Sequence, residues 1–253
     1  MLEQYIKDRL KKKDILLMTH IVLGYPSFED NIKIIEGMVK GGVDIMELQI
    51  PFSEPTADGP VIVAANQKAI KNRVRVEDCL KTAEKITAMF DIPFLVMTYY
   101  NIPFTYGLDK FITRMKDIGI KGAIIPDLPP EEGEEYITSM KNYDLAPILI
   151  YSPNTSEQRM KYLDSHAQGF IYCAARKGVT GAETTFSNDL ADYLLLCRNS
   201  TRLATAVGFG IKEKQDIDYL KGKADIAVIG SQTIRLVDQE GVEAVEPFIK
   251  GLL

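Results

Sequence analysis

The chain has 253 residues, 46% of them hydrophobic and 26% charged, as expected of a globular protein with a large core. Its formal net charge of −5 disfavours nucleic acid as a partner, because neutralising phosphates needs a basic surface. No apolar run approaches the roughly 20 residues that span a bilayer, and residues 1–13 lack the apolar core of a signal peptide, so we expect no membrane association and a cytoplasmic location.

Short β-type runs alternate with amphipathic segments from residues 1–13, which read as an N-terminal helix, to the end of the chain. We predict strands at Ile15–Val22, Asp44–Ile50, Pro93–Tyr99, Ala123–Ile125, Pro147–Tyr151, Phe170–Ala174, Leu203–Val207 and Ile226–Ile229. We predict helices at Ser27–Val39, twice within Pro60–Phe90 with a break near Arg73–Arg75, and at Leu108–Ile118, Glu131–Asn142, Ser156–Ser165, Asn188–Arg198, Glu213–Leu220, Ser231–Asp238 and Val242–Lys250.

This alternation predicts an α/β protein with a single (β/α)8 barrel of the TIM type over residues 1–253. The barrel would carry an extra N-terminal helix and a short phosphate-binding helix after the eighth strand. A doubly wound open sheet is the competing architecture. No linker or low-complexity tract divides the chain, so we expect one domain.

Polar residues at the ends of the predicted strands are the candidates for chemistry, because barrel active sites lie at the C-terminal ends of the strands. In the second strand, alternation places Met46, Leu48 and Ile50 toward the helices and Glu47 and Gln49 toward the interior. A buried glutamate there suits a general acid/base, whose pKa burial would raise. The alternative is a glutamate bonded to neighbouring backbone at the barrel mouth.

The loop that follows, Pro51–Pro60, is stiffened by three prolines and carries Asp58 eleven residues after Glu47. Two carboxylates in different environments can divide acid and base roles. The alternative for Asp58 is a turn or helix-cap residue before Gly59 and Pro60.

Glycines follow both of the last two strands, in Val207–Ile211 and Ile229–Thr233. Backbone N–H groups at a helix start attract anions, and the loops after strands seven and eight of such barrels frequently bind phosphate. A phosphate-ester substrate is therefore expected. The loop Ala175–Glu183, with two cations, reads either as a lid over that anion or as an exposed loop.

Tyr99 at the end of strand three and Tyr172 in strand six suit a flat substrate, or ordinary barrel packing. His20, which ends strand one, reads as a hydrogen-bonded bystander more readily than as a catalyst. No spacing of histidines and cysteines matches a metal motif or a disulfide framework, and no metal is expected.

These residues carry a family resemblance. Glu47–Pro60 closely resembles the signature of the tryptophan synthase alpha chain family, and four further motifs in the same order resemble it too: Tyr99–Asn101 with Gly107, Pro126–Glu132, Arg176–Ala182 and Gly208–Ile211. The likeness runs from about residue 18 to residue 233, most of the chain. It implies retro-aldol cleavage of indole-3-glycerol phosphate to indole and glyceraldehyde 3-phosphate.

The resemblance also implies roles for single residues. Glu47 would protonate the indole C3 and take the proton of the glycerol hydroxyl, and Asp58 would hold the indole N–H. The residues expected to bind the rest of the substrate are Tyr172, Tyr99, Met97, Ile124 and Thr180. The phosphate would be held by Gly181, Phe209, Gly210, Gly230 and Ser231.

No cofactor is implied on this chain, because pyridoxal phosphate belongs to the beta chain that receives indole in an α2β2 heterotetramer. Asn101 matches a loop residue that faces this partner. The chain departs from the family at Gln49, usually Gly, at Glu54, usually Asp, and at His20, commonly apolar. Three other readings remain: a free-standing lyase, a non-catalytic activator of the beta chain, and another phosphate-binding barrel such as a sugar-phosphate epimerase.

Overall fold

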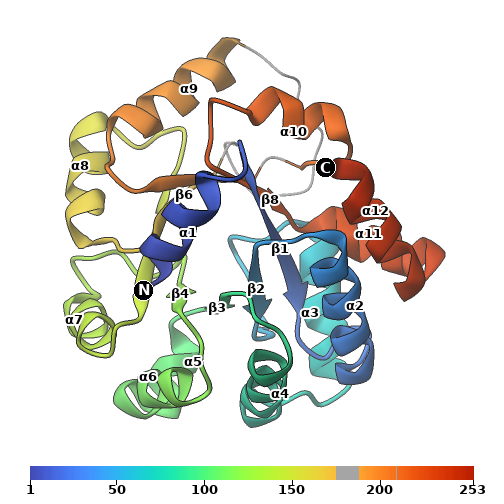
Figure 1. Ribbon diagram of the computed structural model, residues 1–253. Coiled ribbons are helices and arrows are strands. Elements are labelled where there is room, and N and C mark those ends of the chain that lie inside the picture. The colour runs from blue at the N-terminus through green and yellow to red at the C-terminus, as the bar shows by residue number, and fades with distance from the viewer. Residues whose placement is uncertain (175–187, 209) are drawn as a thin grey trace.

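Eight parallel strands close into a barrel in the order of the sequence in the computed structural model, which describes residues 1–174, 188–208 and 210–253 (Figure 1). The strands are β1 (Leu16–Val22), β2 (Ile45–Gln49), β3 (Phe94–Met97), β4 (Gly122–Ile124), β5 (Ala146–Tyr151), β6 (Phe170–Ala174), β7 (Ala204–Gly208) and β8 (Ile226–Ile229). Pairing of β8 with β1 closes the ring. The predicted barrel is confirmed, and the open sheet is excluded.

Helices surround the strands on the outside (Figure 1). They are α1 (Leu2–Leu10), α2 (Phe28–Gly41), α3 (Pro60–Lys71), α4 (Val76–Met89), α5 (Asn101–Tyr106), α6 (Leu108–Asp117), α7 (Glu134–Asn142), α8 (Glu157–His166), α9 (Asn188–Asn199), α10 (Lys214–Leu220), α11 (Ser231–Glu240) and α12 (Val245–Leu252), with a 3₁₀ turn at Val242–Ala244 before the last. Within the described ranges, no helix is both long enough and apolar enough to cross a bilayer.

The first barrel helix shows how local signals set the boundaries. Ser27 caps α2 by accepting a hydrogen bond from the N–H of Asp30, and Gly42 ends it with a φ of 103°. A left-handed backbone of this kind favours glycine at a helix end. Both ends of α2 are therefore set by residues at the helix boundaries themselves.

Alternation along the strands separates two apolar layers. Met46, Leu48 and Ile50 belong to the layer between strands and helices, as predicted. The inner layer fills the barrel with residues such as Leu16, Met18, Ile45, Leu95, Met97, Ile124, Phe170 and Val228. Glu47 and Gln49 have the inward parity of this second layer, so the backbone delivers them to the barrel mouth.

Several predicted boundaries differ from the structure, two of them near the strand ends that carry the candidate residues, and helix α5 was not predicted. Strand β3 ends at Met97 rather than at Tyr99, because the N–H of Tyr100 donates to the carboxylate of Asp127 and the chain turns at once into α5. Helix α7 begins three residues later than predicted. The N–H of Gly133 donates to the carbonyl of Pro129, which makes the preceding segment a turn.

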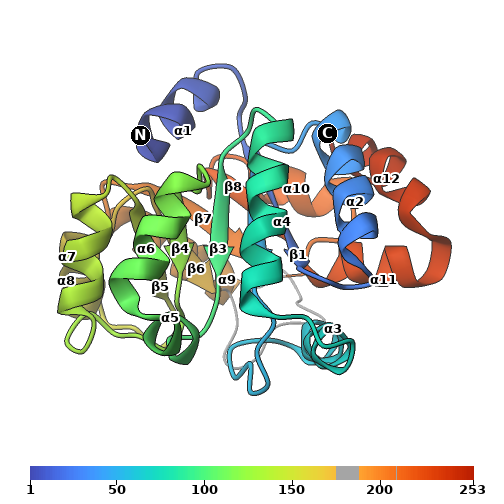
Figure 2. The ribbon, with the colours of Figure 1, turned by 90° about the horizontal axis from the view of Figure 1, so that it is seen from below.

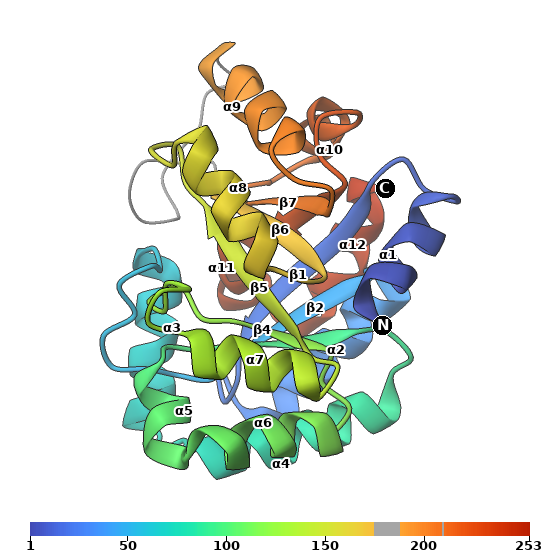
Figure 3. The ribbon, with the colours of Figure 1, turned by 90° about the vertical axis from the view of Figure 1, so that its left-hand side faces the viewer.

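The N-terminal helix covers the end of the barrel at which the strands begin, opposite the loop between β2 and α3 (Figures 2 and 3). Leu2 and Ile6 join the inner apolar layer. The fully buried carboxylate of Asp44 accepts from Arg9 Nε at 2.9 Å, Lys13 Nζ at 2.9 Å and the N–H of Leu17 at 3.0 Å. These bonds tie α1 to the start of β2.

Replacing Asp44 should therefore destabilise the fold. We expect Asp44→Asn to lower the free energy of unfolding in urea by about 2 kcal/mol. This is less than the ~3–5 kcal/mol typical of breaking a fully buried pair, because the side chains of Arg9 and Lys13 are 38% and 27% exposed. The control is Asp8→Asn on α1, whose ion pair with Lys11 is exposed, so its loss should change the free energy of unfolding far less than the loss of Asp44. Equal stability of the two variants would contradict this role of Asp44.

Candidate active site

Two buried carboxylates lie at the C-terminal end of β2. Glu47 is on the strand itself and is 5% exposed, while Asp58 is on the loop before α3 and is 7% exposed. The loop and the ends of the strands lie at the opposite end of the barrel from α1 (Figure 2). This is the end at which barrel enzymes place their chemistry.

The carboxylate of Glu47 is held from one side. Strands β1 and β2 pair so that His20 stands opposite Glu47, and His20 Nδ1 lies 3.1 Å from Glu47 Oε1. Oε2 of Glu47 and Nε2 of His20 are buried and have no hydrogen-bond partner within the described residues. Glu47 thus has one anchored oxygen and one open oxygen.

The proton affinity of His20 is set by opposing effects. Burial of the imidazole acts to lower its pKa, but the charge of Glu47, the hydrogen bond to it and the charge of Asp58 outweigh burial. The pKa of His20 therefore lies above its ordinary value.

Asp58 is held by two donors on the same oxygen. Gln49 Nε2 donates to Asp58 Oδ2 at 2.7 Å, and the hydroxyl of Tyr99 donates to it at 3.0 Å. The Tyr99 oxygen accepts from the N–H of Ala57, and its ring stacks on Phe52 at 5.1 Å between centroids. Burial raises the pKa of Asp58, while His20, Gln49 and Tyr99 oppose that rise. The pKa of Asp58 therefore lies above its ordinary value, and the two hydrogen bonds fix its carboxyl group in place.

Apolar and aromatic side chains from β3, β4 and β6 form another part of the barrel wall. Met97 and Ile124, on β3 and β4, are buried in the inner layer, and Tyr172 of β6 packs against that layer. The Tyr172 hydroxyl fills the space beside Gly208, where an added Cβ would lie only 2.6 Å from it. Burial and the charges of both carboxylates raise the pKa of Tyr172, so the phenol stays neutral.

The two glycine-bearing loops end neighbouring strands β7 and β8. Gly210 has a φ of 90°, which a glycine adopts without strain. Gly230 is the N-cap of α11, and no side chain caps that end of the helix. Ser231 begins the helix, and its hydroxyl accepts from Arg235 at 3.4 Å. An uncapped helix start beside a glycine suits a phosphate group.

The structure thus places nine of the predicted residues around one end of the barrel: Glu47, Asp58, Met97, Tyr99, Ile124, Tyr172, Gly210, Gly230 and Ser231. Thr180, Gly181, Phe209 and the predicted lid segment lie outside the described residues.

Sequence reasoning missed three residues that shape the site. His20 was read as a bystander, Gln49 as a departure from a family pattern, and Phe52 was not singled out. The interior parity of Gln49 was visible in the sequence. The contact between His20 and Glu47 depends on the register of β1 against β2, which alternation does not give.

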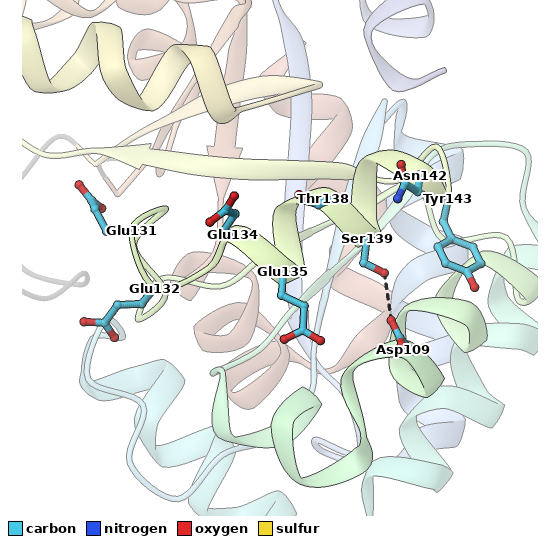
Figure 4. Close-up of a pocket in the computed structure, with 9 residues that line it drawn as sticks. All are labelled: Asp109, Glu131, Glu132, Glu134, Glu135, Thr138, Ser139, Asn142 and Tyr143. Carbon is cyan, nitrogen blue, oxygen red and sulfur yellow. Dashed lines mark hydrogen bonds between the residues drawn. The ribbon is translucent and has the colours of Figure 1, made fainter.

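A second hollow lies on the outer surface over α6 and α7, with a volume of about 790 Å³ (Figure 4). Its lining is dominated by the carboxylates of Asp109, Glu131, Glu132, Glu134 and Glu135. This concentration of negative charge would repel a phosphate ester. Within the described part of the chain, no group of three or more His, Cys, Asp or Glu side chains is arranged to hold a metal ion.

Comparisons with known proteins agree with this geometry. The family model described as "Tryptophan synthase alpha chain" matches residues 6–249. A relative of that name from Desulforapulum autotrophicum is 59% identical over 252 residues, with 100% of each chain covered. Among solved structures, one from Aquifex aeolicus is 34% identical with a TM-score of 0.89, and tryptophan synthase from Mycobacterium tuberculosis is 26% identical with a TM-score of 0.92; each alignment covers 99% of this chain and 96% of the other. This chain belongs to the tryptophan synthase alpha chain family.

Proposed function

We propose that Glu47 and Asp58 carry out the reaction that membership of this family assigns to the chain, the cleavage of indole-3-glycerol phosphate to indole and glyceraldehyde 3-phosphate. The observation that carries this proposal is the contrast between the two buried carboxylates. Among the described residues, Glu47 keeps one buried oxygen without a partner, whereas Asp58 is held on one oxygen by two donors. The first suits a group that moves protons, and the second suits a fixed negative charge.

The reaction needs both a group that transfers protons and a fixed negative charge. Breaking the bond between the indole ring and the glycerol chain requires a proton on C3, which turns the indole into a leaving group. Positive charge then develops toward N1, where the anion of Asp58 would stabilise it. Once deprotonated, Glu47 can accept the proton of the glycerol hydroxyl as that carbon becomes an aldehyde.

The other predicted site residues would bind the indole ring and the phosphate group of the substrate. Met97, Ile124, Tyr99 and Tyr172 would enclose the flat indole ring, because these side chains bring apolar and aromatic surface to the carboxylates. The phosphate would sit at the start of α11, near Gly210, Gly230 and Ser231. Thr180, Gly181 and Phe209 remain predictions for the same substrate.

We further propose that the chain works without a cofactor of its own. Its reaction consists of proton transfers and one C–C cleavage, which a glutamate and a fixed anion can support. Pyridoxal phosphate would belong to the beta chain. A cytoplasmic location and the absence of nucleic-acid binding remain part of this proposal.

The partner would be the tryptophan synthase beta chain in an α2β2 heterotetramer. Relevant neighbours include a tryptophan synthase from Mycobacterium tuberculosis and one described as a tryptophan synthase complex from Pyrococcus furiosus. In this chain, Phe104 of α5 is 68% exposed and touches only the ring of Tyr100 among described aromatic side chains. Helix α5, which begins at Asn101, lies at the same end of the barrel as the loop bearing Glu54 (Figure 3). An exposed phenylalanine on a helix at the active-site end of the barrel suits a partner surface.

Removing either carboxylate should abolish most of the activity. We expect Glu47→Gln to lower kcat by about 10²–10⁴-fold, the usual range for a general acid/base. Asp58→Asn should lower it by roughly 10²–10³-fold, as for a lost electrostatic stabiliser. Steady-state assays of indole-3-glycerol phosphate cleavage, with and without added beta chain, test this.

The control for these assays is Glu36→Gln on α2, which removes an exposed carboxylate and should leave kcat unchanged. Wild-type activity in both site variants would refute the assignment of these two residues. Full activity of the wild type without any response to the beta chain would identify a free-standing lyase. Stimulation of the beta reaction without any cleavage would identify a non-catalytic activator.

The partner surface can be tested separately. Phe104→Lys should weaken binding of the beta chain by at least about tenfold, because an exposed aromatic residue at the centre of an interface commonly contributes this much or more. Calorimetric titration with the beta chain measures the effect. The matched control is Leu195→Lys on α9, a residue that is 59% exposed. Equal affinities of the two variants would place the interface elsewhere.

A further inference from the structure

The two oxygens of the Glu47 carboxylate have different surroundings. Oε1 lies 3.1 Å from His20 Nδ1, whereas Oε2 is buried without a partner within the described residues. Nε2, on the other side of the same imidazole, is also buried and unpartnered there. Buried polar atoms without hydrogen bonds are costly and rare, and one at an active site marks a place that a ligand or a proton fills.

From this asymmetry we propose that His20 is a positioning residue for Glu47, whose N–H at Nδ1 holds Oε1 so that Oε2 exchanges protons with the substrate. This inference rests on the lyase reaction proposed above. In the resting enzyme the pair carries one mobile proton, on Oε2 of Glu47 or on Nε2 of His20. The proton on Nδ1 stays in the hydrogen bond to Oε1 in both forms.

The pair of Glu47 and His20 ends one turnover with the same number of protons as it had at the start. Oε2 gives its proton to C3 of the indole ring, and the hydrogen bond from His20 stabilises the carboxylate that remains. As the C–C bond breaks, its electron pair returns to the indole ring and the hydroxyl carbon becomes the aldehyde. The hydroxyl proton passes to Oε2 of Glu47, so the pair regains the proton that it gave.

The surroundings of His20 identify what controls its charge. Burial acts to lower its pKa, whereas the charge of Glu47 on β2 and the hydrogen bond to it, the charge of Asp58 on the following loop and the amide of Gln49 act together to raise it above the ordinary value. From β8 and α11, the neighbours are the uncharged residues Gly230, Thr233 and Ile234.

Tyr25 is the other titratable side chain beside the small cavity next to His20. Its hydroxyl donates to Asp238 and accepts from Lys68. Because Tyr25 is bonded to these two side chains and the carboxylates raise the pKa of His20, the pair of His20 and Glu47 should keep its mobile proton to a higher pH than an isolated imidazole.

Two substitutions of His20 test this through the pH dependence of the reaction. His20→Asn keeps an N–H donor near the position of Nδ1 but cannot hold the mobile proton, and His20→Phe removes both functions. We expect the fall of kcat/KM at high pH to move to lower pH by about 1–2 pH units in His20→Asn, because a lone carboxyl ordinarily loses its proton about two pH units below an imidazole. Below that fall, kcat of His20→Asn should stay within about threefold of wild type. His20→Phe should lose about tenfold or more, because the carboxylate is no longer oriented.

A second measurement does not depend on activity. The chain has only two histidines, so NMR spectra of the imidazole C–H groups contain one other histidine signal, from His166, which a His166→Asn variant assigns. We expect His20 to titrate above the ordinary histidine value in the wild-type chain. In Glu47→Gln it should titrate at lower pH, because the largest charge opposing burial is gone.

The outcomes separate the two proposals. If the wild type cleaves indole-3-glycerol phosphate but the pH profile of His20→Asn matches it, the positioning role is wrong and the lyase assignment stands. Titration of His20 at the same pH in the wild type and in Glu47→Gln would overturn the pairing itself. If the wild type cleaves no substrate, the proposed function fails, and the role of His20 in that reaction fails with it.

Discussion

The burial of two carboxylates in the mouth of a packed barrel is the constraint on which the rest of the site depends. A barrel interior is filled with side chains, and a charge there is costly unless neighbouring groups hold it. Glu47 and Asp58 meet this cost with polar partners from nearby strand ends: His20 from β1, Gln49 from β2 and Tyr99 beyond β3. Side chains alternate along a strand, so the alternation that points apolar residues into the barrel interior also points His20 and Gln49 inward at its mouth.

Strand β2 carries buried carboxylates near both of its ends, and their surroundings differ in an informative way. Asp44, just before the strand, accepts bonds from Arg9, Lys13 and the backbone of Leu17, so both of its oxygens are bonded. Glu47 leaves Oε2 open within the described residues. A fully bonded carboxylate ties α1 to the barrel, whereas a half-bonded one keeps an oxygen available for proton transfer. In this short segment, Asp44 serves the stability of the fold and Glu47 serves the proposed reaction. Barrels generally separate these two roles between their two ends.

The sequence was sufficient for features that depend on local patterns. Alternation placed Glu47 and Gln49 inside, and the helix predicted at Ser27–Val39 agrees with α2 to within two residues at each end. It was insufficient where distant segments meet. The contact of His20 with Glu47 depends on strand register, and the early end of β3 depends on the bond from Tyr100 to Asp127, 27 residues away in the chain. The roles of Thr180, Gly181 and Phe209 stay predictions, because those residues lie outside the described part of the chain.

The polar residues at positions 20 and 49 are best understood together. A glutamine or a histidine inside a barrel needs a hydrogen-bond acceptor, and a buried carboxylate needs a donor, so each would be unfavourable alone. Here Gln49 meets Asp58 and His20 meets Glu47, which matches two donors to two acceptors. This makes the β1–β2 side of the mouth polar, while Met97, Ile124 and Tyr172 keep the wall at β3, β4 and β6 apolar and aromatic. A flat ring with one N–H group would therefore turn its polar edge toward Asp58 and its faces toward β3, β4 and β6. In the proposed function, the polar residues at positions 20 and 49 would be compatible with this orientation of the substrate, and His20 places a second proton-binding group beside Glu47.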